Sequence, residues 1–256
     1  MPSRLLVCIL VPALLLLLAR PLASQQQPDA APSEIPDVVY QHPEESPPLW
    51  VRMDQAITPS GKLTELVRES DLEAIARWLV ETAPALEDCI DLPPSSHQGI
   101  EAHQTLDHMV AWADGIIVGR VTDSGRGFYY GIPGTLLQIE PVEWLRAPSN
   151  VRQRDDYFIF VGAGVFEIGD DPVCVYGSDW ADLPEKGEEV IAFFERQWGP
   201  DGRFLWTSYG AGIVTLRADG RVSVPAPQRS SLHQRNISGK DAYLALLRAE
   251  IRGDDE

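Results

Sequence analysis

The longest uninterrupted hydrophobic stretch of the chain lies at its start. Residues 5–19 are all apolar or proline, and the basic residue Arg4 comes just before them. A membrane-spanning helix needs about 20 apolar residues, so this stretch has the length of a signal-peptide core. Small residues near Ser24 suit cleavage. The sequence therefore predicts a signal peptide over residues 1–24 and export to the periplasm or the extracellular space, with no stable membrane span in the mature chain. An uncleaved anchor is the alternative.

The pattern changes twice before residue 113. Residues 25–59 are predicted to be a Pro-rich tether, because their first half is dominated by Gln, Pro, Ala, Ser and Glu. Residues 60–112 carry apolar positions at helical spacing, and Ser-Asp-Leu-Glu at 70–73 is a capping-box pattern. We expect two short helices between residues 60 and 83 and another over residues 100–112. Together they would form a helical N-terminal extension.

From residue 113 onward, short apolar runs alternate with turn signals. The runs predict strands over residues 115–121, 128–130, 135–145, 157–161, 190–194, 203–208, 213–216 and 221–224. Turns are expected at residues 123–127, at residues 199–202 and at Asp219-Gly220, a strong hairpin signal. Pro141 inside a strand predicts a bulge or a sheet edge. Ser238 is expected to cap a final amphipathic helix.

This succession predicts a mainly β fold, either a small antiparallel, OB-like barrel or a sandwich. The β-barrel domain would cover residues 113–256 and end in the C-terminal helix. Strands do not alternate with helices in this region, which argues against an α/β fold.

The composition adds a strong acidic excess. The chain has 21 Lys and Arg against 38 Asp and Glu, a formal net charge of −17 at pH 7. Such a charge repels nucleic acid and anionic lipid, so neither is expected as a partner. An unidentified protein or a glycan remains the expected partner.

Cysteine usage fits an oxidising compartment. Cys8 lies inside the predicted signal peptide, so the mature chain would keep Cys89 and Cys174. Two cysteines in an exported protein most often pair, which predicts a disulfide between them. Two free buried thiols are the alternative, because spacing alone does not show that the two Cα atoms approach.

Three phrases of the β region carry a family resemblance. They are Ala-Asp-Gly-Ile-Ile-Val-Gly-Arg-Val at 113–121, Val-Glu-Trp-Leu-Arg at 142–146 and Gly-Glu-Glu-Val-Ile-Ala-Phe-Phe at 187–194. Through them, residues 113–224 resemble OB-fold domains of the netrin and tissue-inhibitor-of-metalloproteinase type, and also uncharacterised exported bacterial proteins. The resemblance implies an OB-type barrel. The inhibitors use a cysteine immediately before the barrel to reach a protease zinc; here the nearest is Cys89, so protease inhibition is not carried over.

One glycine-rich segment resembles a cofactor loop without completing it. Residues 161–164 read Val-Gly-Ala-Gly after a predicted strand, as in a dinucleotide-binding loop. The fingerprint then needs glycine where Glu167 stands, and Asp170-Asp171-Pro172 follow where a helix should begin. We therefore expect a bend between strands and no cofactor.

His97, His103 and His108 cluster in sequence, with Asp107 nearby. On a helix, His103 and Asp107 would share a face, whereas His108 would lie about 140° from His103. This is not the paired-imidazole arrangement of zinc hydrolases. A polar helix lying over the barrel is the expectation. A metal site at His103, Asp107 and His108, in a secreted hydrolase or metalloenzyme, is the alternative.

Tryptophans supply the remaining candidates. Trp112, Trp144 and Trp206 are expected in the core, whereas Trp180 and Trp198 fall in predicted loops. Exposed rings in loops can stack on a sugar or hold a peptide, and packing under a loop is the alternative. No catalytic residue is assigned. The sequence thus favours a non-enzymatic binding or envelope-associated module.

Overall fold

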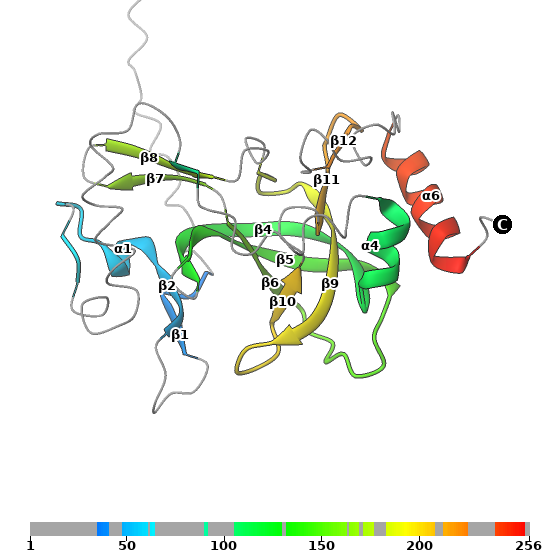
Figure 1. Ribbon diagram of the computed structural model, residues 1–256, viewed down its shortest axis with the longest axis horizontal. Helices are drawn as coiled ribbons and strands as arrows, with labels where there is room; N and C mark the ends of the chain where they lie inside the picture. The colour runs from blue at the N-terminus through cyan, green and yellow to red at the C-terminus, as the bar shows by residue number, and fades with distance from the viewer. Residues whose placement is uncertain are drawn as a thin grey trace, which may run out of the picture. The chain divides into compact units, whose positions relative to one another are not determined.

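Two long antiparallel strands organise the chain in the computed structural model (Figure 1). Strand β4 (Gly115–Tyr129) pairs with β5 (Ile132–Arg146) along almost its whole length. The structure describes residues 35–40, 48–60, 62–64, 90–91, 105–129, 132–162, 164–168, 171–176, 183–207, 212–224 and 239–253. The signal peptide predicted for residues 1–24 lies outside them. Of the two helices predicted between residues 60 and 83, the start is wrong, because the described residues 60 and 62–64 are not helical and Leu63 forms an isolated β-bridge with Ile57. The rest of that span lies outside the described residues.

Three further strands close these two into a barrel. They are β6 (Tyr157–Val161), β9 (Glu189–Trp198) and β10 (Phe204–Thr207). The order is β4–β5–β6–β10–β9, and β9 pairs back onto β4. All neighbours are antiparallel except β6 and β10, which are parallel. The fold is therefore mainly β, with a closed five-stranded barrel and a C-terminal helix, which confirms the predicted fold class.

Alternate residues of these strands fill the barrel. Ile159 from β6, Phe194 from β9 and Leu205 from β10 belong to one buried cluster, and each is at most 4% exposed. Tyr157 lies at its margin, where its hydroxyl donates to the carbonyl of Arg152 (3.0 Å) and accepts from the amide of Arg154 (2.9 Å). Burial raises the pKa of Tyr157 above the ordinary tyrosine value.

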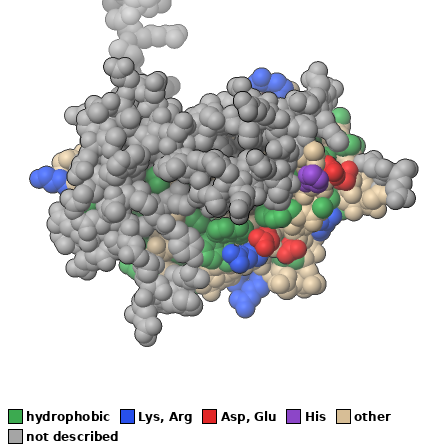
Figure 2. Space-filling view, in the orientation of Figure 1, with side chains coloured by type: hydrophobic (Ala, Val, Ile, Leu, Met, Phe, Trp, Pro, Cys, Tyr) green, Lys and Arg blue, Asp and Glu red, His purple; other side chains and the backbone are tan. Residues whose placement is uncertain are grey.

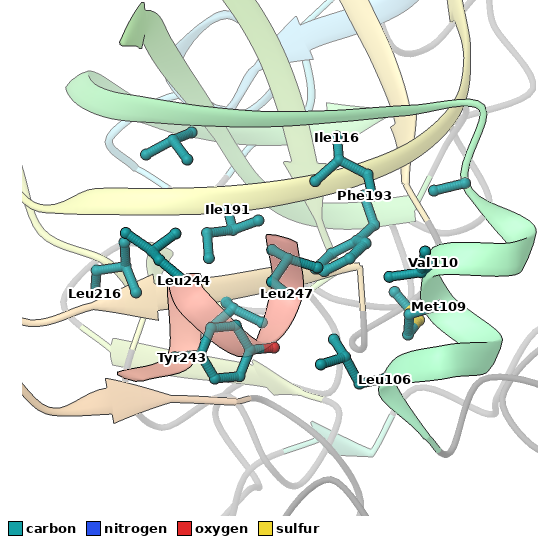
Figure 3. Close-up of a cluster of buried hydrophobic side chains, with 13 residues drawn as sticks. Leu106, Met109, Val110, Ile116, Ile191, Phe193, Leu216, Tyr243, Leu244 and Leu247 are labelled. Atoms are coloured by element: carbon teal, nitrogen blue, oxygen red, sulfur yellow. The ribbon is translucent and has the colours of Figure 1, made fainter. Parts of the chain in front are cut away.

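Two helices cover the outside of β4 and β9. Helix α4 (Leu106–Trp112) contributes Met109, and α6 (Lys240–Arg252) contributes Leu247, to a cluster that includes Phe193 of β9. Figure 3 shows side chains from both helices converging on this strand. The predicted helix before the barrel is confirmed over the span of α4. Among the described residues, no helix is long and apolar enough to cross a membrane.

The N-terminal segment packs against the barrel. Strand β2 (Pro48–Arg52) pairs with β1 (Val38–Tyr40) on one side and with β4 on the other, and helix α1 (Met53–Ala56) follows. Trp50 is fully buried, and its indole N–H donates to the carbonyl of Pro36 (2.9 Å). The predicted tether is therefore wrong for the described residues 35–40 and 48–59. The apolar run at residues 49–51 buries enough surface to order its neighbours.

Two smaller groups of strands complete the described chain. Strands β7 (Gly164–Ile168) and β8 (Asp171–Tyr176) form a hairpin, and β3 (Ile90–Asp91) pairs with β8 in parallel. Strands β11 (Ile213–Leu216) and β12 (Val222–Ser223) form the hairpin that Asp219-Gly220 predicts, with Gly220 at φ +85°. Strand β7 follows β6, where a dinucleotide-binding loop would need a helix.

Two turns, a bulge and a helix cap were also predicted from the sequence. The turn predicted at residues 123–127 is wrong, because β4 runs through this stretch without a break. The bulge predicted at Pro141 is confirmed by a register shift where Pro141 faces Gly119. The turn at residues 199–202 joins β9 to β10, as predicted. The predicted cap Ser238 is wrong: Gly239 is the N-cap of α6, at φ +103°.

Candidate ligand-binding surface

One outer face of the barrel is lined by aromatic side chains. We call the following residues the aromatic cluster: Tyr129, Phe158, Phe160, Trp198, Phe204 and Trp206. They share a face because successive side chains of a strand point to opposite sides. Ile159 and Leu205 belong to the cluster inside the barrel. The residues on either side of them, Phe158 and Phe160 in β6 and Phe204 and Trp206 in β10, therefore point outward.

The rings of the aromatic cluster contact one another in sequence across four strands. Tyr129 stacks on Phe160 with ring centroids 4.7 Å apart, and Trp198 meets Tyr129 edge-on at 5.5 Å. Trp198 in turn meets Trp206 edge-on at 5.7 Å, and Phe158 lies 5.3 Å from Phe204. Contacts of this kind contribute about 0.5–1.5 kcal/mol each beyond area burial, so the cluster is a rigid platform.

Part of this platform reaches the surface. Tyr129, Phe158 and Phe204 are buried, whereas Phe160, Trp198 and Trp206 are only partly buried. The cluster is thus anchored by its inner rings and presents its outer ones. On the face drawn in Figure 2, hydrophobic side chains likewise reach the surface with basic and acidic side chains beside them.

Two guanidinium groups lie against these rings. Arg196, on β9, is exposed and lies over Trp206 at 5.3 Å from the ring centroid. Arg203 lies over Phe158 at 4.4 Å and forms an ion pair with Asp156. Asp156 also accepts a hydrogen bond from the buried amide of Gln138 (2.6 Å), so Arg203 is held in place. Of these two guanidinium groups, that of Arg196 is the more exposed to solvent.

The side chains of this surface are of kinds that can hold a ligand. Rings and guanidinium groups hold a ligand by apolar contact, stacking and charge. Large planar side chains also lose little conformational entropy on binding, since they have two rotatable bonds. The aromatic cluster lies on one outer face of the five-stranded barrel, beside the turn that joins β9 to β10.

The candidate metal ligands do not come together in the described part of the chain. Asp107 and His108 are both exposed on α4, at its first turn. The amide of His108 donates to the hydroxyl of Thr105 (3.4 Å), and a hydrogen bond from Thr105 lowers the pKa of Asp107. His97 and His103 lie outside the described residues. The described residues hold no group of three metal-ligating side chains, and the metal site stays a prediction.

The two tryptophans singled out from the sequence have different outcomes. Trp180 lies outside the described residues. Trp198 ends strand β9 instead of lying in a loop, and it packs between Tyr129 and Trp206. A stacking role for its outer edge stays a prediction.

Sequence reasoning missed Phe160 and took Trp206 for a core residue. In β6 every residue is apolar, because one face fills the barrel and the other joins the aromatic cluster. Such a run carries no alternation that would separate the two faces. The usable signal was the aromatic character of alternate residues 158 and 160.

Comparisons with known proteins do not extend this picture. The sequence matches no model of a known protein family and no curated protein.

Proposed function

We propose that this protein is an exported, non-enzymatic binding module that holds its ligand on the aromatic cluster of an OB-like barrel. One observation carries the proposal: Phe160, Trp198 and Trp206 are partly exposed on one face, with Arg196 stacked on Trp206. Exposing such rings opposes the hydrophobic effect, and their ordered packing supports a binding role.

The ligand class follows from the side chains on offer. A ligand with an apolar face would contact Trp198 and Trp206, and an acceptor group on it would pair with Arg196. The acidic excess of the whole chain does not favour nucleic acid. A protein segment or a glycan meets these requirements.

Binding screens with matched variants test this function. The mature protein would be applied to an immobilised glycan panel and to a library of immobilised peptides. Trp206→Ala is expected to weaken binding of the selected ligand about thirtyfold, the loss typical of a central aromatic residue of an interface. Trp112→Ala is the control, because Trp112 packs against the separate cluster beneath α4 and α6. Equal binding by wild type and Trp206→Ala would contradict the proposal.

Export to an oxidising compartment is the second part of the proposal, and the β3–β8 register supports a disulfide. Ile90 pairs with Val175 in these parallel strands, and in the sequence each of the two residues directly follows a cysteine. Neighbouring strands lie about 4.8 Å apart, within the Cα range of disulfides. Cys89 itself lies outside the described residues.

Intact mass of the exported protein tests both ideas. A mature chain beginning near residue 25 is expected, with a gain of about 2 Da on reduction. A retained N-terminus would contradict export through a cleaved signal peptide. An unchanged mass on reduction, with both thiols open to alkylation before it, would exclude the Cys89–Cys174 bond.

A further inference from the structure

The N-terminal segment pairs with the edge of β4 as a bound peptide would. We call residues 35–40 and 48–52 the arm. We propose that the edge of β4 at residues 127–129, together with the adjoining aromatic cluster, is a binding site for an extended peptide bearing a large aromatic side chain. The arm fills this site until a partner peptide replaces it. This inference rests on the proposed binding function and names its partner class.

Backbone pairing is the first requirement of such a site, and the arm meets it. Trp50 faces Tyr129, Val51 faces Phe128 and Arg52 faces Gly127 in antiparallel register. Main-chain hydrogen bonds of this kind do not depend on the sequence of the added strand. Another extended segment can therefore make the same ladder.

A pocket for one large ring is the second requirement. Trp50 is fully buried and belongs to the same cluster as Tyr129, Leu136 and Phe204. Its indole N–H is satisfied by the carbonyl of Pro36, also in the arm. The site thus accepts a tryptophan of an added strand, which lies against Gly127 and joins the same buried cluster as Tyr129 and Phe204.

Glycines of β4 shape the floor of the site. A Cβ added at Gly127 would lie 2.6 Å from the Trp50 ring and closer still to the carbonyl oxygen of Val51. A Cβ at Gly125 would lie 2.7 Å from a methyl group of Ile35. Each position thus allows an approach that any side chain would block. These glycines fit β4 to receive a strand here.

The arm is held by a short stretch of sheet. Strand β2 pairs with β4 over three residues, whereas β4 and β5 pair over thirteen. Arg52 forms ion pairs with Asp37 (2.8 Å) and Asp54 (2.7 Å), but both partners lie in the N-terminal segment, so neither pair ties the arm to the barrel. The side chains of Leu49, Trp50 and Val51 hold the arm more firmly, since each is fully buried. A peptide that replaces the arm must therefore supply both the three-residue ladder and a large buried ring.

A peptide added in trans tests the exchange. The probe is a fluorescein-labelled peptide with the sequence of residues 46–54, Ser-Pro-Pro-Leu-Trp-Val-Arg-Met-Asp, measured by fluorescence polarisation against the mature protein. The Trp50→Ala protein is expected to bind it at least about tenfold more tightly than wild type, because the weakened arm leaves the site open more often. The double variant Trp50→Ala/Gly127→Val is expected to lose this binding. A probe with alanine in place of tryptophan should not bind.

Folding and specificity need separate controls. Near-UV circular dichroism of each variant reports whether the barrel is intact. If Trp50→Ala does not fold, Val51→Ala replaces it, since it removes only two methyl groups from a buried side chain of the arm, and a gain of about threefold in probe affinity is expected. Equal probe affinity for wild type and the arm variant overturns the inference, as does binding that survives Gly127→Val. If Trp206→Ala abolishes binding of a screened ligand while the probe fails to bind, the proposed function stands and the peptide site does not.

Discussion

Trp50→Ala is the most direct test of how firmly the arm is part of the fold. The wild-type ring is fully buried among aromatic and aliphatic side chains, and its N–H donates to Pro36. Replacing a buried tryptophan by alanine typically costs about 3–5 kcal/mol, from lost burial and the cavity left behind. With a urea slope of about 2 kcal/mol/M, the unfolding midpoint would fall by about 1.5–2.5 M.

The conservative variant separates the ring from its hydrogen bond. Trp50→Phe keeps most of the apolar contact but removes the donor to the carbonyl of Pro36, and is expected to cost about 1–3 kcal/mol. If the arm undocks as a unit, the loss of unfolding free energy in either variant cannot exceed the free energy with which the arm docks on the barrel. Hydrogen exchange distinguishes undocking of the arm from unfolding of the whole domain. If the arm undocks, the backbone amide of Arg52, which donates to the backbone carbonyl of Asp37, would lose protection. The backbone amide of Phe158, which donates to the backbone carbonyl of Arg203, would keep it.

One result would contradict a structural role for the Trp50 ring. An unchanged urea midpoint for Trp50→Ala, with unchanged exchange at Arg52, would mean that the ring contributes nothing to the folded state. The sequence-based prediction of a tether would then be correct for residues 48–52, and the peptide site on β4 would lose its basis.

Three further predictions concern the barrel. Gly134→Ala should cost about 1–3 kcal/mol in unfolding free energy by urea denaturation, because its Cβ would clash with the carbonyl oxygen of Val161 and the ring of Phe160, whereas Gly162→Ala, with nothing closer than 4.0 Å, should be nearly neutral. Since burial raises the pKa of folded Tyr157, the folded state holds that proton more tightly; the contribution of Tyr157 to stability should be constant below about pH 10 and be lost above it, and Tyr157→Phe should reduce the alkaline loss in pH-dependent melts. Asp156→Ala should lower the melting temperature through a loss of about 1–3 kcal/mol, because Gln138 and Arg203 lose their acceptor, while exposed Asp155→Ala should not.

Local rules predicted the parts of the fold that local chemistry controls. The Asp219-Gly220 hairpin follows from backbone conformations that glycine adopts without strain, and the structure has Gly220 at φ +85°. The bulge at Pro141 follows from a missing N–H donor. Buried strands such as β6 were recognisable as continuous apolar runs. None of these features depends on which distant segments meet.

The errors arise where the conformation of a residue depends on a partner that is distant in sequence. Glycines at 125 and 127 suggested a turn, yet they lie within β4 and receive Ile35 and Trp50 of the arm. The arm in turn was taken for part of a tether, because prolines and polar residues outnumber apolar ones across residues 25–59 as a whole, although not within the arm itself. The two errors are linked. Without the arm as a partner, the glycines indicate a turn, and without the glycine positions of β4, the arm has no surface on which to pack.

The same coupling explains why the aromatic cluster could not be derived from sequence. Its rings come from β4, β6, β9 and β10, and each strand supplies aromatic residues that a buried core would also use. Only barrel closure decides which alternate residues face inward. Once it does, Ile159 fills the interior and Phe160 reaches the surface one residue later. A single shift of register in β6 would exchange these two roles, so the exposure of Phe160 and the stability of the barrel depend on the same register.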